Sequence, residues 1–458
     1  MKNTLAILLI LFLSHHVSGQ NITGDWYGEI QIQGLNLSIQ FHISETENGF
    51  QSTMDSPDQG ATGIPVTTTT YQAPNLTLKV SSAGLEYNGV FDEQSQTING
   101  NLTQMGNSFP LKLDRNKKEK ERPQLPKAPF PYKSEDISFT NTIDGITLSG
   151  TLTIPEGKGP FPSVVLVSGS GPQNRDSEIM GHKPFWVLAD HLSRNGIAVL
   201  RYDDRGTAAS KGDFKTATTL DLANDAEAAF TFLLNQESSD KTRTGIIGHS
   251  EGGIIAPMIA ERNDNIAFLI LLAAPTLRGD KLMLLQKKKV EEKSGVNPIT
   301  IEKSQEIFGG AYYKIVNATP ETALADTLHT YFMDKFEGGI PESRLNTIIA
   351  QLTSPWMVGF MKYDPEPVLE KLTLPILAIY GSNDLQVPPK PNLTIMQEAL
   401  KKAGNQSATV LELRFLNHLM QESETGLPGE YGLIPQTLSP EVMNLISEWI
   451  KDQFRRQQ

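Results

Sequence analysis

Residues 244–260 read Thr-Gly-Ile-Ile-Gly-His-Ser-Glu-Gly-Gly-Ile-Ile-Ala-Pro-Met-Ile-Ala. The pattern predicts a short buried strand over residues 244–247 and an apolar helix over residues 253–260, with Gly248-His249-Ser250-Glu251-Gly252 between them as G-x-S-x-G. A strand followed by a sharp turn and a helix lifts the central hydroxyl clear of the sheet. Gly248 and Gly252 flank Ser250 because such a strained turn leaves no room for a Cβ on either side. Ser250 is therefore the candidate nucleophile.

A serine hydroxyl reacts only when a base takes its proton and a third group orients that base. Of the eight histidines, His418 lies after Asp384 and follows a predicted strand at residues 409–415. Asp384 itself follows the predicted strand at residues 374–380 and a glycine turn. Nucleophile, acid and histidine thus occur in the order Ser250, Asp384, His418, which favours a catalytic triad. Asp364, which precedes a proline, is the weaker alternative for the acid.

Stabilising an oxyanion needs two backbone donors that point at the developing charge. The N–H of Glu251 is one candidate, and the glycine loop Gly169-Ser170-Gly171 supplies the other, which we expect to be Ser170. The loop lacks the lysine of a phosphate-binding G-K-[ST] motif. The charged segment at residues 201–206 follows its own strand, and we interpret it as a turn that braces neighbouring loops. No histidine cluster accompanies its Asp203 and Asp204, so a metal site is not predicted there.

Composition excludes several classes of function. The 458-residue chain contains no cysteine, which rules out disulfides, thiolate metal sites and a cysteine nucleophile. Its formal charge of −12 argues against nucleic acid or an anionic membrane as the main partner. We expect neither a cofactor nor a metal ion.

The N-terminus has the pattern of an export signal. Lys2 precedes the apolar run at residues 5–13, which is too short to span a bilayer, and Val17-Ser18-Gly19 offers small residues for cleavage before Gln20. We therefore expect residues 1–19 to be removed. The mature protein would then be periplasmic or extracellular, with no stable membrane insertion.

The rest of the chain divides into an all-β unit, a linker and an α/β unit. Residues 20–113 contain several short alternating strands, which predict a small sandwich or barrel. A structural or substrate-guiding role is the default for this unit, with contact to a glycan or a cell surface as the alternative. The charged, proline-bounded residues 114–134 form the linker. Over residues 135–458, continuous apolar strands alternate with helices, which indicates a doubly wound, mostly parallel sheet. Mostly helical residues at about 277–372 interrupt it as a lid.

Several segments together resemble the α/β-hydrolase superfamily over roughly residues 135–455, and bacterial exported carboxylesterases of the EstD type in particular. The segments that carry the resemblance are residues 168–176, 202–206, 248–253, 354–356, 381–384 and 417–418. The resemblance implies a small-molecule substrate, an ester with a short or medium acyl group, and the triad Ser250, Asp384 and His418, without a cofactor. It does not extend to the N-terminal unit.

Two other functions stay open at this stage. Serine aminopeptidases share the serine turn and the triad order, and they would need an acidic group in the lid to hold the substrate ammonium. Glu337, Glu342 and Asp364 are the candidates for that group. A non-catalytic binding protein that uses the β unit is the third reading, and the intact set of catalytic residues argues against it.

Overall fold

The computed structural model describes residues 22–32, 35–59, 61–104, 106–117 and 120–455. The expected export signal at residues 1–19 lies outside these ranges. The chain divides into two units, residues 1–119 and 120–458. Within the described ranges, no helix is both long and apolar enough to cross a membrane.

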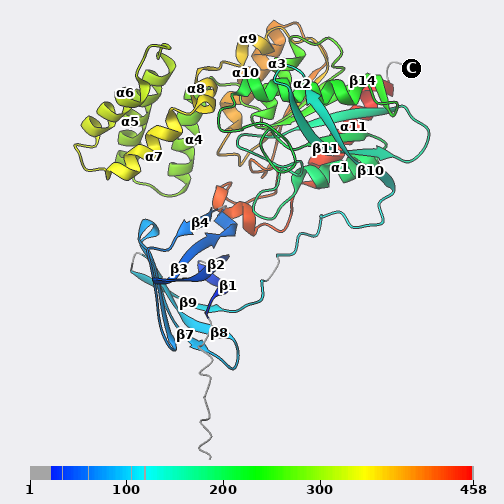
Figure 1. Cartoon of the computed structure of the whole chain (residues 1–458). Helices are drawn as coiled ribbons and strands as arrows, with labels where there is room; N and C mark the ends of the chain where they lie inside the picture. The colour runs from blue at the N-terminus through cyan, green and yellow to red at the C-terminus, as the bar shows by residue number, and fades with distance from the viewer. Residues whose placement is uncertain (1–21, 33–34, 60, 105, 118–119, 456–458) are drawn as a thin grey trace, which may run out of the picture. The chain divides into compact units, whose positions relative to one another are not determined.

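The N-terminal unit consists of two antiparallel sheets around one core (Figure 1). Alternation buries one side of each strand, so that Trp26, Phe41 and Tyr87 are almost completely enclosed. Tyr27 and Asp114 exchange backbone hydrogen bonds of 2.8 and 2.9 Å, which link the two sheets. Strand patterns at residues 35–43, 75–80, 85–91, 97–102 and 109–113 predicted five of the strands, and four others (β1, β3, β4 and β5) were not foreseen. The strands are β1 (Gly24–Ile32), β2 (Leu35–Thr46), β3 (Gly49–Ser56), β4 (Ala61–Pro65), β5 (Thr68–Gln72), β6 (Asn75–Val80), β7 (Leu85–Asp92), β8 (Thr97–Gln104) and β9 (Asn107–Leu113).

An eight-stranded sheet in the order β10-β11-β13-β12-β14-β15-β16-β17 forms the centre of the second unit. Strand β11 is antiparallel to both neighbours, and the other adjacent pairs are parallel. The mostly parallel α/β sheet predicted from the sequence is thus confirmed. The strands are β10 (Tyr132–Asn141), β11 (Ile146–Pro155), β12 (Phe161–Val167), β13 (Ala198–Tyr202), β14 (Ser239–His249), β15 (Leu269–Leu272), β16 (Ile376–Gly381) and β17 (Ala408–Leu413).

Helices cover both faces of this sheet, which explains why its central strands are continuously apolar (Figure 1). One apolar cluster includes α2 (Thr219–Leu234), α3 (Gly252–Ala260) and α10 (Pro389–Lys402). The other includes α1 (Pro184–Arg194) and α11 (Pro440–Arg455). After β12 the chain continues to β13 on one side of it and then returns to β14 on the other. Loops that follow β12 and β14 therefore meet at a switch point, where α/β sheets bind ligands.

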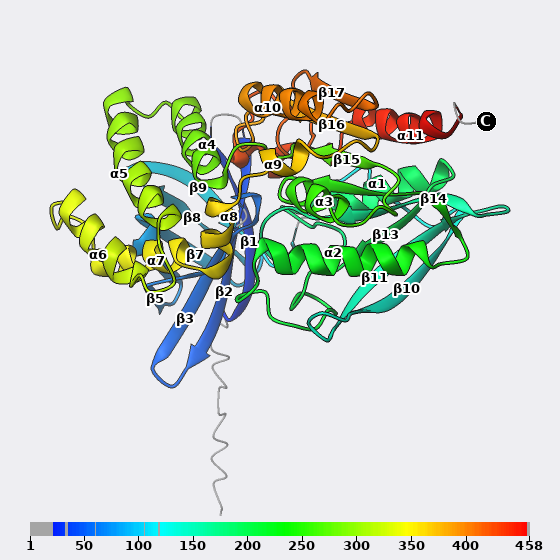
Figure 2. The same cartoon turned by 90° about the horizontal axis from the view of Figure 1, so that it is seen from above.

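The lid consists of helices that gather beside the sheet (Figure 2). Four of them were predicted: α4 (Gly279–Lys293), α5 (Pro298–Val316), α6 (Leu324–Lys335) and α7 (Glu342–Leu352). The short helices α8 (Pro355–Lys362) and α9 (Glu366–Leu369) were not. Helix α8 forms because Pro355 occupies a first-turn position, where its missing N–H costs nothing, and the Ser354 hydroxyl accepts from the N–H of Met357 at 3.3 Å.

Candidate active site

The turn at Ser250 is as strained as its glycines suggest. Ser250 has a φ of +54°, in the left-handed region that non-glycine residues seldom occupy. A Cβ on Gly248 would lie 2.1 Å from the carbonyl oxygen of Gly252, and one on Gly252 would lie 2.2 Å from that of Val167. The N–H of Ser250 donates to the carbonyl of Leu272 at 2.9 Å, which ties the turn to β15. Close backbone packing therefore requires both motif glycines.

The three residues of the predicted triad lie together at the carboxyl ends of the strands. Nε2 of His418 lies 3.0 Å from Oγ of Ser250, and Nδ1 lies 2.8 Å from Oδ2 of Asp384. Oδ1 of Asp384 accepts from the N–H groups of Gln386 and Val387, each at 2.8 Å. One carboxylate thus stabilises its own turn and orients the imidazole. Asp364 instead accepts from the N–H of Glu366 at 3.3 Å.

Uncharged groups hold the loop that carries His418. The side-chain oxygen of Asn417 accepts from the N–H groups of Leu419 and Gln421, at 2.9 and 3.0 Å. Nε2 of His249 lies 2.8 Å from the carbonyl oxygen of His418 and donates to it. Burial lowers the pKa of His249 to about 4, so this ring is neutral at neutral pH. No role for His249 was predicted, because its partner His418 lies 169 residues away in the chain.

The two predicted oxyanion donors belong to residues near Ser250: Glu251 follows it in the chain, and Ser170 lines the same cavity. Gly169 approaches so closely that a Cβ there would lie 3.0 Å from Cβ of Ser250, and Gly171 has a φ of +92°. Within the described part of the chain, the N–H groups of Ser170 and Glu251 donate to no backbone carbonyl. They are therefore available to a substrate oxygen.

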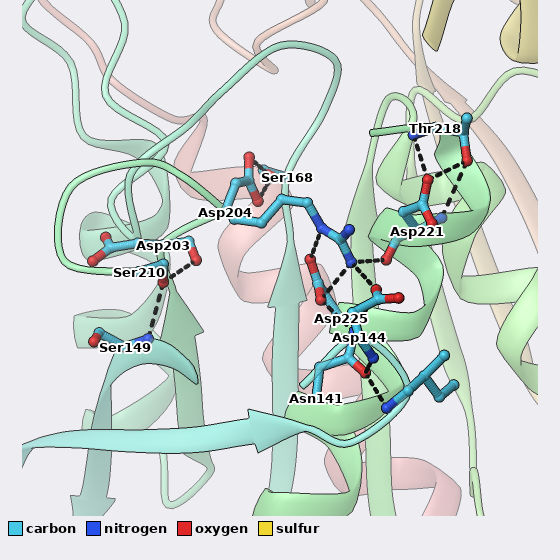
Figure 3. A network of polar contacts seen from close by, with 12 residues as sticks. Asn141, Asp144, Ser149, Ser168, Asp203, Asp204, Ser210, Thr218, Asp221 and Asp225 are labelled. Carbon is cyan, nitrogen blue, oxygen red and sulfur yellow. Dashed lines mark hydrogen bonds and ion pairs between the residues drawn. The ribbon is translucent and has the colours of Figure 1, made fainter. Parts of the chain in front are cut away.

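The charged turn after β13 braces the glycine loop, as its sequence indicated (Figure 3). Oδ1 and Oδ2 of Asp204 accept from the Ser168 hydroxyl at 3.1 and 3.2 Å, and Oδ2 also accepts from the N–H of Gln173 at 2.9 Å. Both ends of the loop are thereby fixed by one side chain. Burial raises the pKa of Asp204 to about 7. The neighbouring Asp203 forms an ion pair with Arg175 at 2.8 Å.

Arg205, in the same turn, is hydrogen-bonded to helix α2. Its guanidinium donates to Oδ2 and Oδ1 of Asp225 at 2.6 and 2.9 Å and to Oδ2 of Asp144 at 2.6 Å. Asp225 is 1% exposed, so the pair is an interior one. The Arg205 pair therefore connects the β10–β11 turn, the charged turn and α2.

A cavity of about 250 Å³ opens beside Ser250 and His418. Lid residues Leu282, Met283 and Gln286 of α4 form part of its wall, with Trp356 and Phe360 of α8. Among the lining residues that the structure describes there is no Asp, Glu, Lys or Arg. The lid acids Glu337, Glu342 and Asp364 lie outside this lining, and Glu342 is 3.0 Å from His329. Sequence reasoning placed the pocket in the lid but could not choose these five residues.

The sheet order, the serine turn after β14 and the helical lid define the fold of an α/β hydrolase. The family model described as serine aminopeptidase, S33, matches residues 184–298, which include Ser250 and end before Asp384. The chain belongs to the α/β-hydrolase superfamily.

Within this superfamily, the chain is similar to esterase EstD of Thermotoga maritima, with 31% identity over 324 residues. The match covers 70% of this chain and 68% of that protein. Among solved structures, the Pyrococcus furiosus esterase Pf2001 is 16% identical, with a TM-score of 0.41 over 70% of this chain and 91% of that one. Ferulic-acid-bound Est1E from Butyrivibrio proteoclasticus is also 16% identical, with a TM-score of 0.41 over 70% and 98%.

Proposed function

We propose that this protein is a serine carboxylesterase that hydrolyses uncharged esters through an acyl-enzyme. The observation that carries the proposal is the hydrogen-bonded chain from Ser250 through His418 to Asp384, beside a cavity with apolar side chains and glutamine amides in its lining. The similarity to an esterase from Thermotoga maritima supports the same reaction class.

In the proposed reaction, Oγ of Ser250 attacks the ester carbonyl carbon while Nε2 of His418 takes the hydroxyl proton. The N–H groups of Ser170 and Glu251 donate to the carbonyl oxygen as it becomes negative, and each such donor typically contributes ~10²–10³ in turnover. The alcohol leaves with the proton from His418. Water then attacks the acyl group, again losing its proton to His418, and the carboxylic acid leaves as Ser250 regains its proton.

The uncharged lining favours ester over peptide substrates. A serine aminopeptidase needs a negative group to bind the substrate ammonium, because a cation that loses its water without a partner is costly. Among the described lining residues, the polar side chains besides Ser250 and His418 are those of His249, Ser170 and Trp356, and the amides of Gln173, Gln286 and Gln386. These groups can hydrogen-bond neutral oxygens.

The decisive experiment compares p-nitrophenyl acyl esters with aminoacyl p-nitroanilides on the purified mature protein. We expect turnover of the esters alone, and Ser250→Ala should lower kcat by on the order of 10⁶. A fluorophosphonate should label the wild-type protein at one site and leave Ser250→Ala unlabelled. Anilide turnover that exceeds ester turnover would instead support the aminopeptidase.

We also infer that the protein is exported, because residues 1–19 have the composition of a cleaved signal. N-terminal sequencing of the protein from a cell-envelope or culture fraction should begin near Gln20. A protein that keeps Met1 in the cytoplasmic fraction would contradict this inference.

A further inference from the structure

Glu251 has a second feature besides its backbone N–H, since its side chain is buried behind the serine turn. The residue is 1% exposed. Oε1 and Oε2 accept from Nε1 of Trp356 at 2.8 and 3.0 Å, and Oε1 also accepts from the Thr219 hydroxyl at 2.7 Å. The carboxylate therefore connects three elements: the serine turn, the N-terminus of α2 and the lid helix α8.

The partners of this carboxylate are neutral. In the part of the chain that the structure describes, no ion pair involves Glu251. Burial raises the pKa of its carboxyl, and hydrogen bonds from neighbours, including the hydroxyl of Ser170, act in the opposite direction. A buried oxygen that loses its donor stays out of water without a compensating hydrogen bond, which is unfavourable. The indole therefore cannot turn away from Glu251 without leaving a buried polar group unpaired.

Trp356 occupies a place where its orientation matters. It lines the catalytic cavity together with Phe360, and the two rings stack with centroids 5.2 Å apart and an interplanar angle of 23°. Thr219, which also donates to Glu251, is fixed by the start of α2, where the hydroxyl of Thr218 and the carboxylate of Asp221 form a capping box. The indole is thus a rigid wall attached to the residue after Ser250.

We propose that Trp356 is a specificity-determining residue that limits the size of the apolar part of the ester, and that Glu251 is the positioning residue that holds it. This inference rests on the proposed esterase function. Trp356 forms part of the wall of the cavity of about 250 Å³ beside Ser250. A shift of the Trp356 indole would change which esters fit the cavity, while the distances between Ser250, His418 and Asp384 stay the same.

The test measures kcat and KM for p-nitrophenyl esters from acetate to decanoate in the wild type and in variants of Trp356 and Glu251. Trp356→Phe keeps a ring but removes the N–H, and Glu251→Ala removes the acceptor. Each should shift the ratio of kcat/KM for long against short esters by on the order of tenfold, mainly through KM. The double variant should resemble either single variant, because both break one interaction.

Glu251→Gln is the conservative rescue. Its amide oxygen can accept from the indole N–H, and the Thr219 hydroxyl can rotate to accept from the amide nitrogen, so the chain-length profile should stay close to wild type. Met283→Leu is the matched control, because Met283 lines the same cavity and has no hydrogen bond to Glu251. Its effect should add to that of Glu251→Ala.

Two outcomes separate the inference from the function on which it rests. If the wild-type protein hydrolyses no ester, the proposed function fails. If the wild type hydrolyses esters but Trp356→Phe and Glu251→Ala leave the chain-length ratio unchanged, or add independently in the double variant, the positioning role of Glu251 is wrong and the esterase function stands.

Discussion

Replacing Asp384 by asparagine changes one atom in the triad, and the surrounding donors determine which way the new amide turns. Oδ1 of Asp384 accepts from two backbone N–H groups, those of Gln386 and Val387, each at 2.8 Å. An amide nitrogen at that position would oppose two donors. The asparagine oxygen must therefore take the place of Oδ1, and its nitrogen must face Nδ1 of His418.

An N–H that faces Nδ1 requires this nitrogen to be an acceptor. The proton of a neutral His418 then resides on Nε2, which lies 3.0 Å from Oγ of Ser250. A protonated Nε2 can no longer accept the hydroxyl proton of Ser250. The wrong tautomer costs on the order of 10⁴ in kcat in serine hydrolases with this constellation, or ~5.4 kcal/mol at 1.36 kcal/mol per factor of ten. We expect a loss of that size for Asp384→Asn, with KM little changed.

The assay is steady-state hydrolysis of p-nitrophenyl butyrate at pH 7.5, with wild type and Asp384→Asn purified in the same way. Guanidinium unfolding of both proteins shows whether the substitution preserves the fold. A folded Asp384→Asn with more than a tenth of the wild-type kcat would refute the argument, since the orientation of His418 would then come from another group.

Three further predictions concern the groups that support the site. Asp204→Ala removes the acceptor for both ends of the glycine loop, so kcat should fall by up to ~10² while KM changes little. A rise in KM as large as the fall in kcat would contradict an effect on the oxyanion donors. Arg205→Met leaves the buried carboxylate of Asp225 unpaired and should lower the free energy of unfolding by about 3–5 kcal/mol in guanidinium, whereas Arg194→Met, which breaks a surface pair, should cost less than about 1 kcal/mol. Burial lowers the pKa of His182 to about 4. Between about pH 6.5 and 4 this residue therefore binds more protons in the unfolded chain than in the folded one, and its contribution to stability is lost as the pH falls. The contribution of His182 should be ~3 kcal/mol, measured by urea unfolding at pH 7.5 and 4.0 as the difference between the pH dependence of wild type and that of His182→Gln.

Local backbone requirements made the serine turn and the sheet predictable. Gly248 and Gly252 are needed because a Cβ on either would lie within about 2.2 Å of a carbonyl oxygen. A sequence that forms this turn must therefore have glycine at both positions, and the two glycines make the turn recognisable. Continuous apolar strands such as residues 269–272 are covered by helices on both sides, and the pattern reports that burial directly. The chain order of nucleophile, acid and histidine then favoured Asp384 over Asp364 as the acid and His418 as the base.

Helix α8 and its tryptophan were not predictable in the same way. Pro355 reads as a helix breaker until its position in the first turn is known, and then it favours the start of a helix. The bond from Trp356 to Glu251 joins residues 105 positions apart, and it exists only because the lid returns over the serine turn. The order of residues in the chain does not indicate that the lid packs against the serine turn. Candidate catalytic residues can therefore be found from motifs, whereas the residue that we propose limits the pocket depends on how the lid helices pack.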